Sequence, residues 1–264
     1  MITINQEVES FLITGPEKKP FRNYIDSKEI FLLLKRFFDI IISTIVIIFL
    51  LSWLIPILSI AIKLNSKGPV FFIQRRVGRG LRSFGCIKFR TMIPNDQTGE
   101  FIPCKNDERV TTLGKFLRRT SLDELPQFIN VFIGDMSIVG PRPHMFADCN
   151  RFSEYIQDYK IRNIVRPGIT GLAQVKGFRG PAEDSYNIVS RFYYDSVYIQ
   201  NLSIRMDVSI LFNTVWQVLS LFFFNNISKK REAKKISIKT TAQKNKRIFK
   251  LCPVFDDLAL LMKN

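Results

Sequence analysis

One long apolar stretch dominates the pattern of hydrophobic and polar positions along the chain. Residues 40–62 are 23 consecutive uncharged positions, most of them Ile, Leu, Val or Phe. An apolar run longer than about 18 residues marks a candidate membrane helix, and the alternative is a buried helix of a soluble protein. The pattern therefore predicts a membrane-bound protein.

The flanks and the interior of this stretch favour a re-entrant helical hairpin. Basic residues precede it at Lys35 and Arg36 and follow it at Lys63 and Lys67, whereas a spanning helix usually has its basic flank on one side. Pro56 lacks an amide hydrogen and clashes with the carbonyl four residues back, so it kinks the helix. We expect a hairpin that enters and leaves the membrane by one face, with a kinked spanning helix as the alternative.

A second uncharged stretch, residues 208–228, is interrupted by four Asn and Gln residues and is too polar to predict a span. Its Leu211, Phe212, Val215 and Leu219 recur at nearly helical spacing. This spacing predicts an amphipathic helix that lies in the membrane interface, and packing against the rest of the protein is the alternative.

Shorter patterns fill the region between these two stretches. Alternating or β-branched segments at 70–73 and 84–89 flank Gly78 and Gly80, which predicts a β-hairpin. Helical periodicity recurs near 113–117, 125–133, 151–164 and 183–200. The expected fold is mixed α/β and mostly helical: a monotopic membrane protein with an N-terminal re-entrant helical hairpin, a short β-hairpin and an interfacial amphipathic helix.

Charge and cysteine content limit the kinds of partner and site that the sequence predicts. The formal net charge of +16 predicts an anionic partner, and residues 229–264 carry half of it. This tail has little apolar periodicity, so we expect an unstructured polybasic segment near anionic membrane lipid, with a merely solvated tail as the alternative. The four cysteines show no C-x-x-C spacing, so neither a zinc site nor a disulfide framework is expected.

Three ordered motifs resemble a known family. They are RRTSLDELPQ at 118–127, GDMSIVGPRP at 134–143 and RPGITGLAQV at 166–175. In this order they resemble the bacterial sugar transferase family, the monotopic phosphoglycosyl transferases that start glycan assembly on undecaprenyl phosphate. The resemblance runs from Lys35 to about Trp216 and is to the catalytic half of the long members of the family. The family's Ser-Pro pair at the helix break is replaced here by Ile55-Pro56.

The resemblance implies a transferase that moves a sugar 1-phosphate from a UDP-sugar to undecaprenyl phosphate and releases UMP, as a first step of exopolysaccharide or capsule synthesis. It also implies an inner (cytoplasmic) membrane protein whose active site faces the cytoplasm. The chain then divides into an N-terminal extension (1–34), a membrane re-entrant helix (35–64), a catalytic domain (65–228) and a polybasic tail (229–264). A homodimer is left open.

Adjacent carboxylates at Asp123 and Glu124 are the candidate catalytic pair. Neighbouring residues of a helix point about 100° apart, so the two side chains can have different roles. The resemblance implies that Asp123 is the nucleophile that forms a covalent phosphosugar intermediate and that Glu124 helps to hold Mg²⁺. The alternative is a helix capping box formed by Ser121 and Glu124.

Guanidinium and ammonium groups near this pair are expected to bind the phosphates of the substrates. Arg118 and Arg142 are the first candidates, and Lys88 and Arg90 are the second. The alternative for Arg142 is a salt bridge within the fold. Asp39 and Asp207 are expected to pair with basic neighbours, and His144 to be structural.

Two other classes of function remain open. A basic nucleic-acid-binding protein would explain the net charge but not residues 40–62, so no nucleic acid partner is expected. A non-catalytic membrane scaffold would explain the apolar stretch but not the carboxylate pair.

Overall fold

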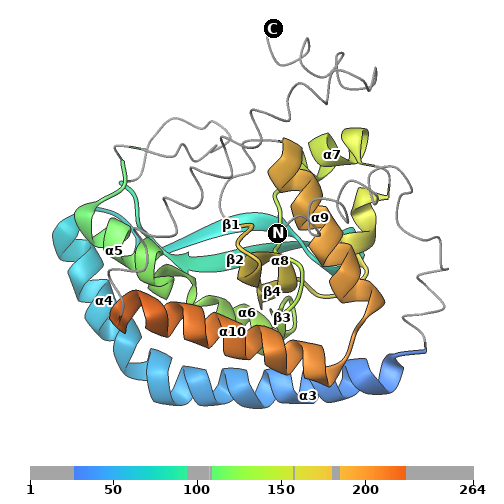
Figure 1. The fold of residues 1–264 in the computed structure, drawn as a ribbon. Helices are drawn as coiled ribbons and strands as arrows, with labels where there is room; N and C mark the ends of the chain where they lie inside the picture. Colours follow the sequence, from blue (N-terminus) through green and yellow to red (C-terminus); the bar gives the residue numbers. More distant parts are fainter. Residues whose placement is uncertain (1–26, 94–106, 108, 157, 180–184, 224–264) are drawn as a thin grey trace, which may run out of the picture. The chain divides into compact units, whose positions relative to one another are not determined.

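The computed structural model describes residues 27–93, 107, 109–156, 158–179 and 185–223 (Figure 1). Most of the expected N-terminal extension and the whole polybasic tail lie outside these residues. The chain divides into two compact units, Met1–Trp216 and Gln217–Asn264, and only Gln217–Phe223 of the second unit is described.

The N-terminal apolar stretch is helical from Glu29 to Asn65. It comprises α3 (Glu29–Val46), the π-helical segment η1 (Ile47–Leu51) and α4 (Ser52–Asn65). In the described part of the chain, this is the one helix that is long and apolar enough to cross a membrane, and 17% of its most apolar window is buried. Because so little is buried, the alternative of a soluble core helix is disfavoured.

This helical segment bends between α3 and α4 (Figure 1). In η1 the helix widens, and the N–H of Ser52 bonds to the carbonyl of Ile47, five residues back. Pro56 follows one turn later inside α4, where Leu58 and Ile62 pack against the globular part. The expected disturbance of the helix is therefore present, mainly as a π-helical turn before the proline. A re-entrant hairpin and a kinked spanning helix both include such a bend.

The predicted β-hairpin is confirmed. Strand β1 (Phe71–Val77) pairs antiparallel with β2 (Ser83–Phe89), from Phe71 opposite Phe89 to Val77 opposite Ser83. The connection contains Gly80 with φ +65°, a left-handed conformation that glycine adopts without steric cost.

A second small sheet was not predicted. Strands β3 (Ser137–Val139) and β4 (Gly168–Thr170) pair in parallel. Gly168 lies so close to Gly140 that an added Cβ would come within 2.1 Å of the Gly140 amide nitrogen. Two of the three motifs therefore meet at this sheet, and glycine is required where they meet.

Helices make up most of the remaining described chain. They are α5 (Thr112–Thr120), η3 (Leu122–Glu124), α6 (Gln127–Ile133), α7 (Phe146–Tyr155), η4 (Tyr159–Asn163), α8 (Leu172–Val175), α9 (Ser185–Gln200) and α10 (Ile204–Phe223). The helices expected near 113–117, 125–133 and 183–200 are confirmed. The continuous helix expected over 151–164 is wrong: α7 ends at Tyr155, and Asp158 has a left-handed conformation before the short 3-10 segment η4.

Helix α10 begins four residues before the expected amphipathic helix, at Ile204, and shows two apolar faces. Ile210 is buried in the main core, whereas Val208, Phe212 and Trp216 are exposed. Packing against the domain and an exposed apolar surface therefore occur on the same helix, and the exposed surface is of the kind that interfacial helices present.

A buried ion pair stabilises the aromatic part of the core. Arg162 of η4 donates to Asp195 of α9 over 2.6 Å, and both side chains are almost completely buried, with 3% and 2% exposed. Arg162 also donates to the hydroxyl of Tyr159, which bonds to the buried ring of His144. His144 is structural, as expected.

We predict that Arg162→Met lowers the free energy of unfolding by about 3–5 kcal/mol, because it leaves the Asp195 carboxylate buried without its partner. Arg151→Met is the matched control: it removes a pair with Asp148 in which Arg151 is half exposed, and should cost less than about 1 kcal/mol. Urea unfolding in a mild detergent measures both, and equal losses would contradict the prediction.

Candidate active site

The two candidate carboxylates lie on a single tight turn. Helix α5 ends at Thr120, Ser121 has a left-handed conformation, and Asp123 and Glu124 occupy the 3-10 turn η3. The side chain of Ser121 caps nothing, and the amide of Glu124 instead bonds to the Ser121 carbonyl, so the capping-box alternative is wrong. Successive residues of a 3-10 turn point about 120° apart, which directs the two carboxylates differently.

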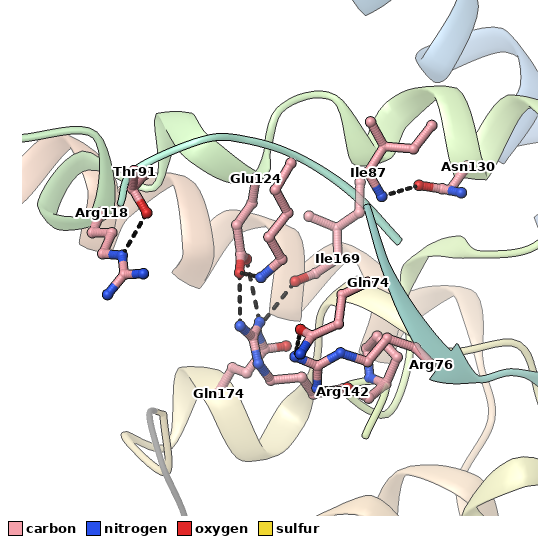
Figure 2. Close-up of polar contacts among 12 residues, drawn as sticks. Gln74, Arg76, Ile87, Thr91, Arg118, Glu124, Asn130, Arg142, Ile169 and Gln174 are labelled. Atoms are coloured by element: carbon pink, nitrogen blue, oxygen red, sulfur yellow. Dashed lines mark hydrogen bonds and ion pairs between the residues drawn. The ribbon is translucent and has the colours of Figure 1, made fainter. Parts of the chain in front are cut away.

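The carboxylate of Glu124 is held by two cations (Figure 2). Lys88 of β2 donates to Oε1 over 2.7 Å, and Arg142, from the loop after β3, donates over 2.7 Å to Oε1 and 3.2 Å to Oε2. Burial alone would raise the pKa of Glu124, but the charges of Arg142 and Lys88 outweigh it and hold the pKa well below its ordinary value. Glu124 is therefore a permanently charged group.

Asp123 has the opposite environment. It is 9% exposed, and burial, followed by the negative charge of Glu124, raises its pKa to about 6. Within the described residues its carboxylate accepts no hydrogen bond and forms no ion pair. Arg118 is close enough to favour the charged form of Asp123, and it donates to Thr91 over 2.8 Å (Figure 2). Asp123 is thus a carboxylate whose oxygens are not already engaged.

The main chain that presents Arg142 is fixed by two further arginines. Arg162 donates to the carbonyl of Arg142 over 2.9 Å, and Arg76 of β1 donates to the carbonyl of Pro143 over 3.2 Å. Neither residue was predicted as part of the site, because nothing in the sequence distinguishes these arginines from exposed ones such as Arg75.

Two more polar groups border this cluster. Burial and the charge of Arg142 lower the pKa of Arg179, whose Nε donates to the carbonyl of Gln174 over 3.2 Å. The side-chain oxygen of Gln174 is buried without a hydrogen-bond partner. Arg179 is the last residue before 180–184, which lie outside the described residues.

Other candidates lie elsewhere. Arg90 is not brought to Glu124: its guanidinium donates to the carbonyls of Ser66 and Lys67, each over 2.7 Å, at the end of α4. Asp39 accepts from the amide of Ile138 over 3.0 Å rather than from a basic side chain, which corrects the expected pairing. Asp207 does pair with a basic neighbour: Lys35 donates to its carboxylate over 2.6 Å.

A divalent cation would have few ligands from the chain itself. The described residues contain no group of three or more His, Cys, Asp or Glu side chains that could hold a metal ion. Asp123 and Glu124 are adjacent, however, and Mg²⁺ is commonly bound by one or two carboxylates together with substrate phosphates. The donor set therefore fits a cation that is shared with a phosphate-bearing substrate.

Comparison with known proteins identifies relatives of this chain. The UDP-glucose:undecaprenyl-phosphate glucose-1-phosphate transferase of Klebsiella pneumoniae is 46% identical over 184 residues, which are 69% of this chain and 39% of that protein. A UDP-N-acetylgalactosamine-undecaprenyl-phosphate N-acetylgalactosaminephosphotransferase of Aeromonas hydrophila is 43% identical over 194 residues, 73% of this chain and 45% of that protein. The chain thus spans less than half the length of these two relatives.

A third relative is only slightly longer than the region in which it matches this chain. The exopolysaccharide production protein PSS of Rhizobium leguminosarum bv. phaseoli is 43% identical over 189 residues, which are 70% of this chain and 94% of that protein. The family profile described as bacterial sugar transferase matches residues 30–221, well over half of the chain. The protein therefore belongs to the bacterial sugar transferase family.

Proposed function

We propose that this protein transfers a sugar 1-phosphate from a UDP-sugar to undecaprenyl phosphate, releasing UMP through a covalent intermediate on Asp123, as a first step of polysaccharide or glycoconjugate synthesis. The activities for which the relatives are named support these two substrates. The alternatives of a membrane scaffold and of a nucleic-acid-binding protein give no role to the carboxylate pair.

The observation that carries the proposal is the contrast between two adjacent carboxylates. Glu124 is charged and held in place by Lys88 and Arg142, whereas Asp123 is buried, has a pKa raised to about 6 and accepts no hydrogen bond within the described residues. Adjacent acids in unlike environments are suited to different chemical roles. Asp123 is thus the one of the pair whose oxygen is available for attack.

The charge around Glu124 supports a diphosphate substrate. Four cations lie close enough to Glu124 or to one another to shift a pKa. They are Lys88, Arg142, Arg76 and Arg179. Glu124 and Asp123 offset part of their charge, which leaves an excess of positive charge. Guanidinium groups bind phosphate oxygens with charge-assisted, often bidentate hydrogen bonds, so a diphosphate is the type of ligand that neutralises this cluster.

The proposed reaction has two displacements at one phosphorus. An oxygen of Asp123 attacks the phosphorus that carries the sugar, the bond from that phosphorus to the bridging oxygen breaks, and UMP leaves. An oxygen of the acceptor phosphate then attacks the same phosphorus, and the Asp123 carboxylate is released. A carboxylate needs no deprotonation at neutral pH, and phosphoryl transfer depends mainly on positioning and charge neutralisation.

Mg²⁺ is part of the proposal, with Glu124 as its ligand from the protein. Glu124 would hold the ion, which would supply positive charge to neutralise the phosphate oxygens of the substrate. Lys88 and Arg142 would keep the Glu124 carboxylate charged and oriented.

The proposed location is the inner (cytoplasmic) membrane, with the active site toward the cytoplasm. The apolar helix, its bend at η1 and the basic residues on both flanks support a re-entrant hairpin formed by α3 and α4. Anionic lipid near the polybasic tail is part of the proposal, and a homodimer stays open.

We predict that Asp123→Asn abolishes transfer while the protein stays folded and membrane-bound, because the amide keeps the shape and removes the nucleophilic oxygen. Intact-mass measurement of the wild type with UDP-sugar alone should show a phosphosugar adduct that the variant lacks. Asp148→Asn, a change outside the cluster, should leave both the adduct and the turnover intact. Near-normal turnover by the Asp123 variant would rule out the covalent role.

The pH dependence should report the raised pKa of Asp123. The reactive form is the carboxylate, so kcat/KM should fall as the pH drops through about 6. Lys88→Met removes a cation that lowers this pKa and should move the acidic limb to higher pH, whereas Glu124→Gln removes the like charge and should move it to lower pH. If neither variant moves the midpoint of the rate profile, another group controls the limb.

The hairpin predicts that residues on both sides of the apolar helix share the cytoplasmic face. Single cysteines at Ser10 and Ser66, in a variant without other cysteines, can be labelled with an impermeant maleimide from outside intact cells. Both should be protected until the cells are opened. Labelling of position 10 but not of position 66 would instead support a spanning helix.

A further inference from the structure

A second cluster of basic groups surrounds a small cavity. Residues of α3 and β3 line it, together with the residues that follow η4. The cavity is lined by Arg36 of α3, Arg79 of the hairpin turn and Arg166 before β4, and Ser137 of β3 is among its walls. None of these residues belongs to the cluster around Glu124. The hydroxyl of Ser137 is buried and has no hydrogen-bond partner.

The three guanidinium groups are bound to backbone carbonyls rather than to carboxylates. Arg36 donates to the carbonyls of Val131 and Phe132, Arg79 Nε to that of Ile164, and Arg166 Nε to that of Gly134. Carbonyl oxygens satisfy N–H groups but leave the positive charge in place. The terminal nitrogens of Arg79 and Arg166 have no partner among the described residues.

The carboxylate of Asp39 lines the cavity and offsets only part of this charge. It favours the charged form of Arg166, but it is one carboxylate beside three guanidinium groups, and it also accepts a hydrogen bond from the amide of Ile138. Lys35, which also lines the cavity, is paired with Asp207. Burial, and after it the charges of Arg36 and Arg79, lower the pKa of Arg166, so the guanidinium groups are close enough to repel one another. An anion bound between them would relieve this repulsion.

Apolar side chains next to the cavity indicate where this anion comes from. Arg36 binds the carbonyl of Phe132, and the side chains of Phe132 and Ile133 are 47% and 61% exposed. Leu33, one turn before Arg36 on α3, is 70% exposed. Basic groups at the edge of an exposed apolar surface are typical of sites at the depth of lipid headgroups.

We infer that Arg36, Arg79 and Arg166 bind the phosphate of an anionic phospholipid headgroup. The forked donors of Arg79 and Arg166 suit phosphate oxygens, and Ser137 offers a further donor from the cavity wall. A phosphate of the lipid acceptor has to reach Asp123 in the proposed reaction, and no neighbour of Asp123 lines this cavity. The occupant is therefore a phospholipid of the surrounding membrane rather than the acceptor.

The test compares lipids that differ in net charge. The full chain, purified in a neutral detergent, is titrated with phosphatidylglycerol or with phosphatidylcholine, and bound lipid is counted by native mass spectrometry. The wild type should retain phosphatidylglycerol in preference. Arg79→Gln combined with Arg166→Gln should weaken its binding about tenfold or more and leave phosphatidylcholine unchanged.

The matched control removes the same charge from exposed positions outside the cavity. Arg75→Gln combined with Arg82→Gln should retain the wild-type preference. Arg79 is an exposed turn residue whose side chain contacts one backbone carbonyl, so the Arg79→Gln variant should still fold. It should bind phosphatidylglycerol about threefold more weakly than the wild type. Circular dichroism and the melting temperature establish that each variant is folded.

Three outcomes would overturn the inference. The first is an equal loss of phosphatidylglycerol binding in the cavity variant and in the surface control. The second is a parallel loss of both lipids, since charge is then not what the protein recognises. The third is a loss confined to undecaprenyl phosphate, titrated in the same way, which would assign the cavity to the acceptor.

Discussion

The pairing of one carboxylate with two cations is the contact on which the geometry of the active cluster depends. Glu124 lies on a short turn, Lys88 on the second strand of the hairpin and Arg142 in the loop after β3, so this contact joins three distant segments. Burying a charge costs free energy unless the charge is paired. The burial of Glu124 therefore depends on Lys88 and Arg142, and theirs depends on Glu124. Among the residues that the structure describes, the carboxylate of Asp123 has no hydrogen-bond or ion-pair partner, and Lys88 and Arg142 are directed at its neighbour.

Much of the positive charge of this protein has a structural purpose. Arg90 donates to a carbonyl at the end of α4, where the last carbonyls of a helix lack partners within it. Arg162 supports the main chain behind Arg142 and is itself neutralised by Asp195. A net charge of +16 is therefore not a measure of ligand affinity. The informative quantity is the charge that each cluster retains after its internal contacts.

Local patterns in the sequence predict local structure well and distant pairing poorly. The β-hairpin and the helices α5, α6 and α9 follow from periodicity and turn residues that act over a few positions. Strands β3 and β4 have three residues each and pair across about 30 residues, so no periodic signal marks them. The same limit applies to the site: the adjacent carboxylates are visible in the sequence, whereas Arg90 and Arg162 are alike as residues and differ only in what the fold places beside them.

A polar contact joins the apolar helices α3 and α10, and this has a consequence for how they can move. Lys35 of α3 pairs with Asp207 of α10 over 2.6 Å, and the second oxygen of Asp207 accepts from Tyr198 of α9 over 2.8 Å. Apolar packing alone would allow these helices to slide, since one aliphatic contact resembles the next. An ion pair in weakly polar surroundings has one favourable geometry, and sliding would leave both charges unpaired. The exposed apolar faces of α3 and of α10 up to Trp216 are thereby held in one register with each other and with the core that carries Glu124.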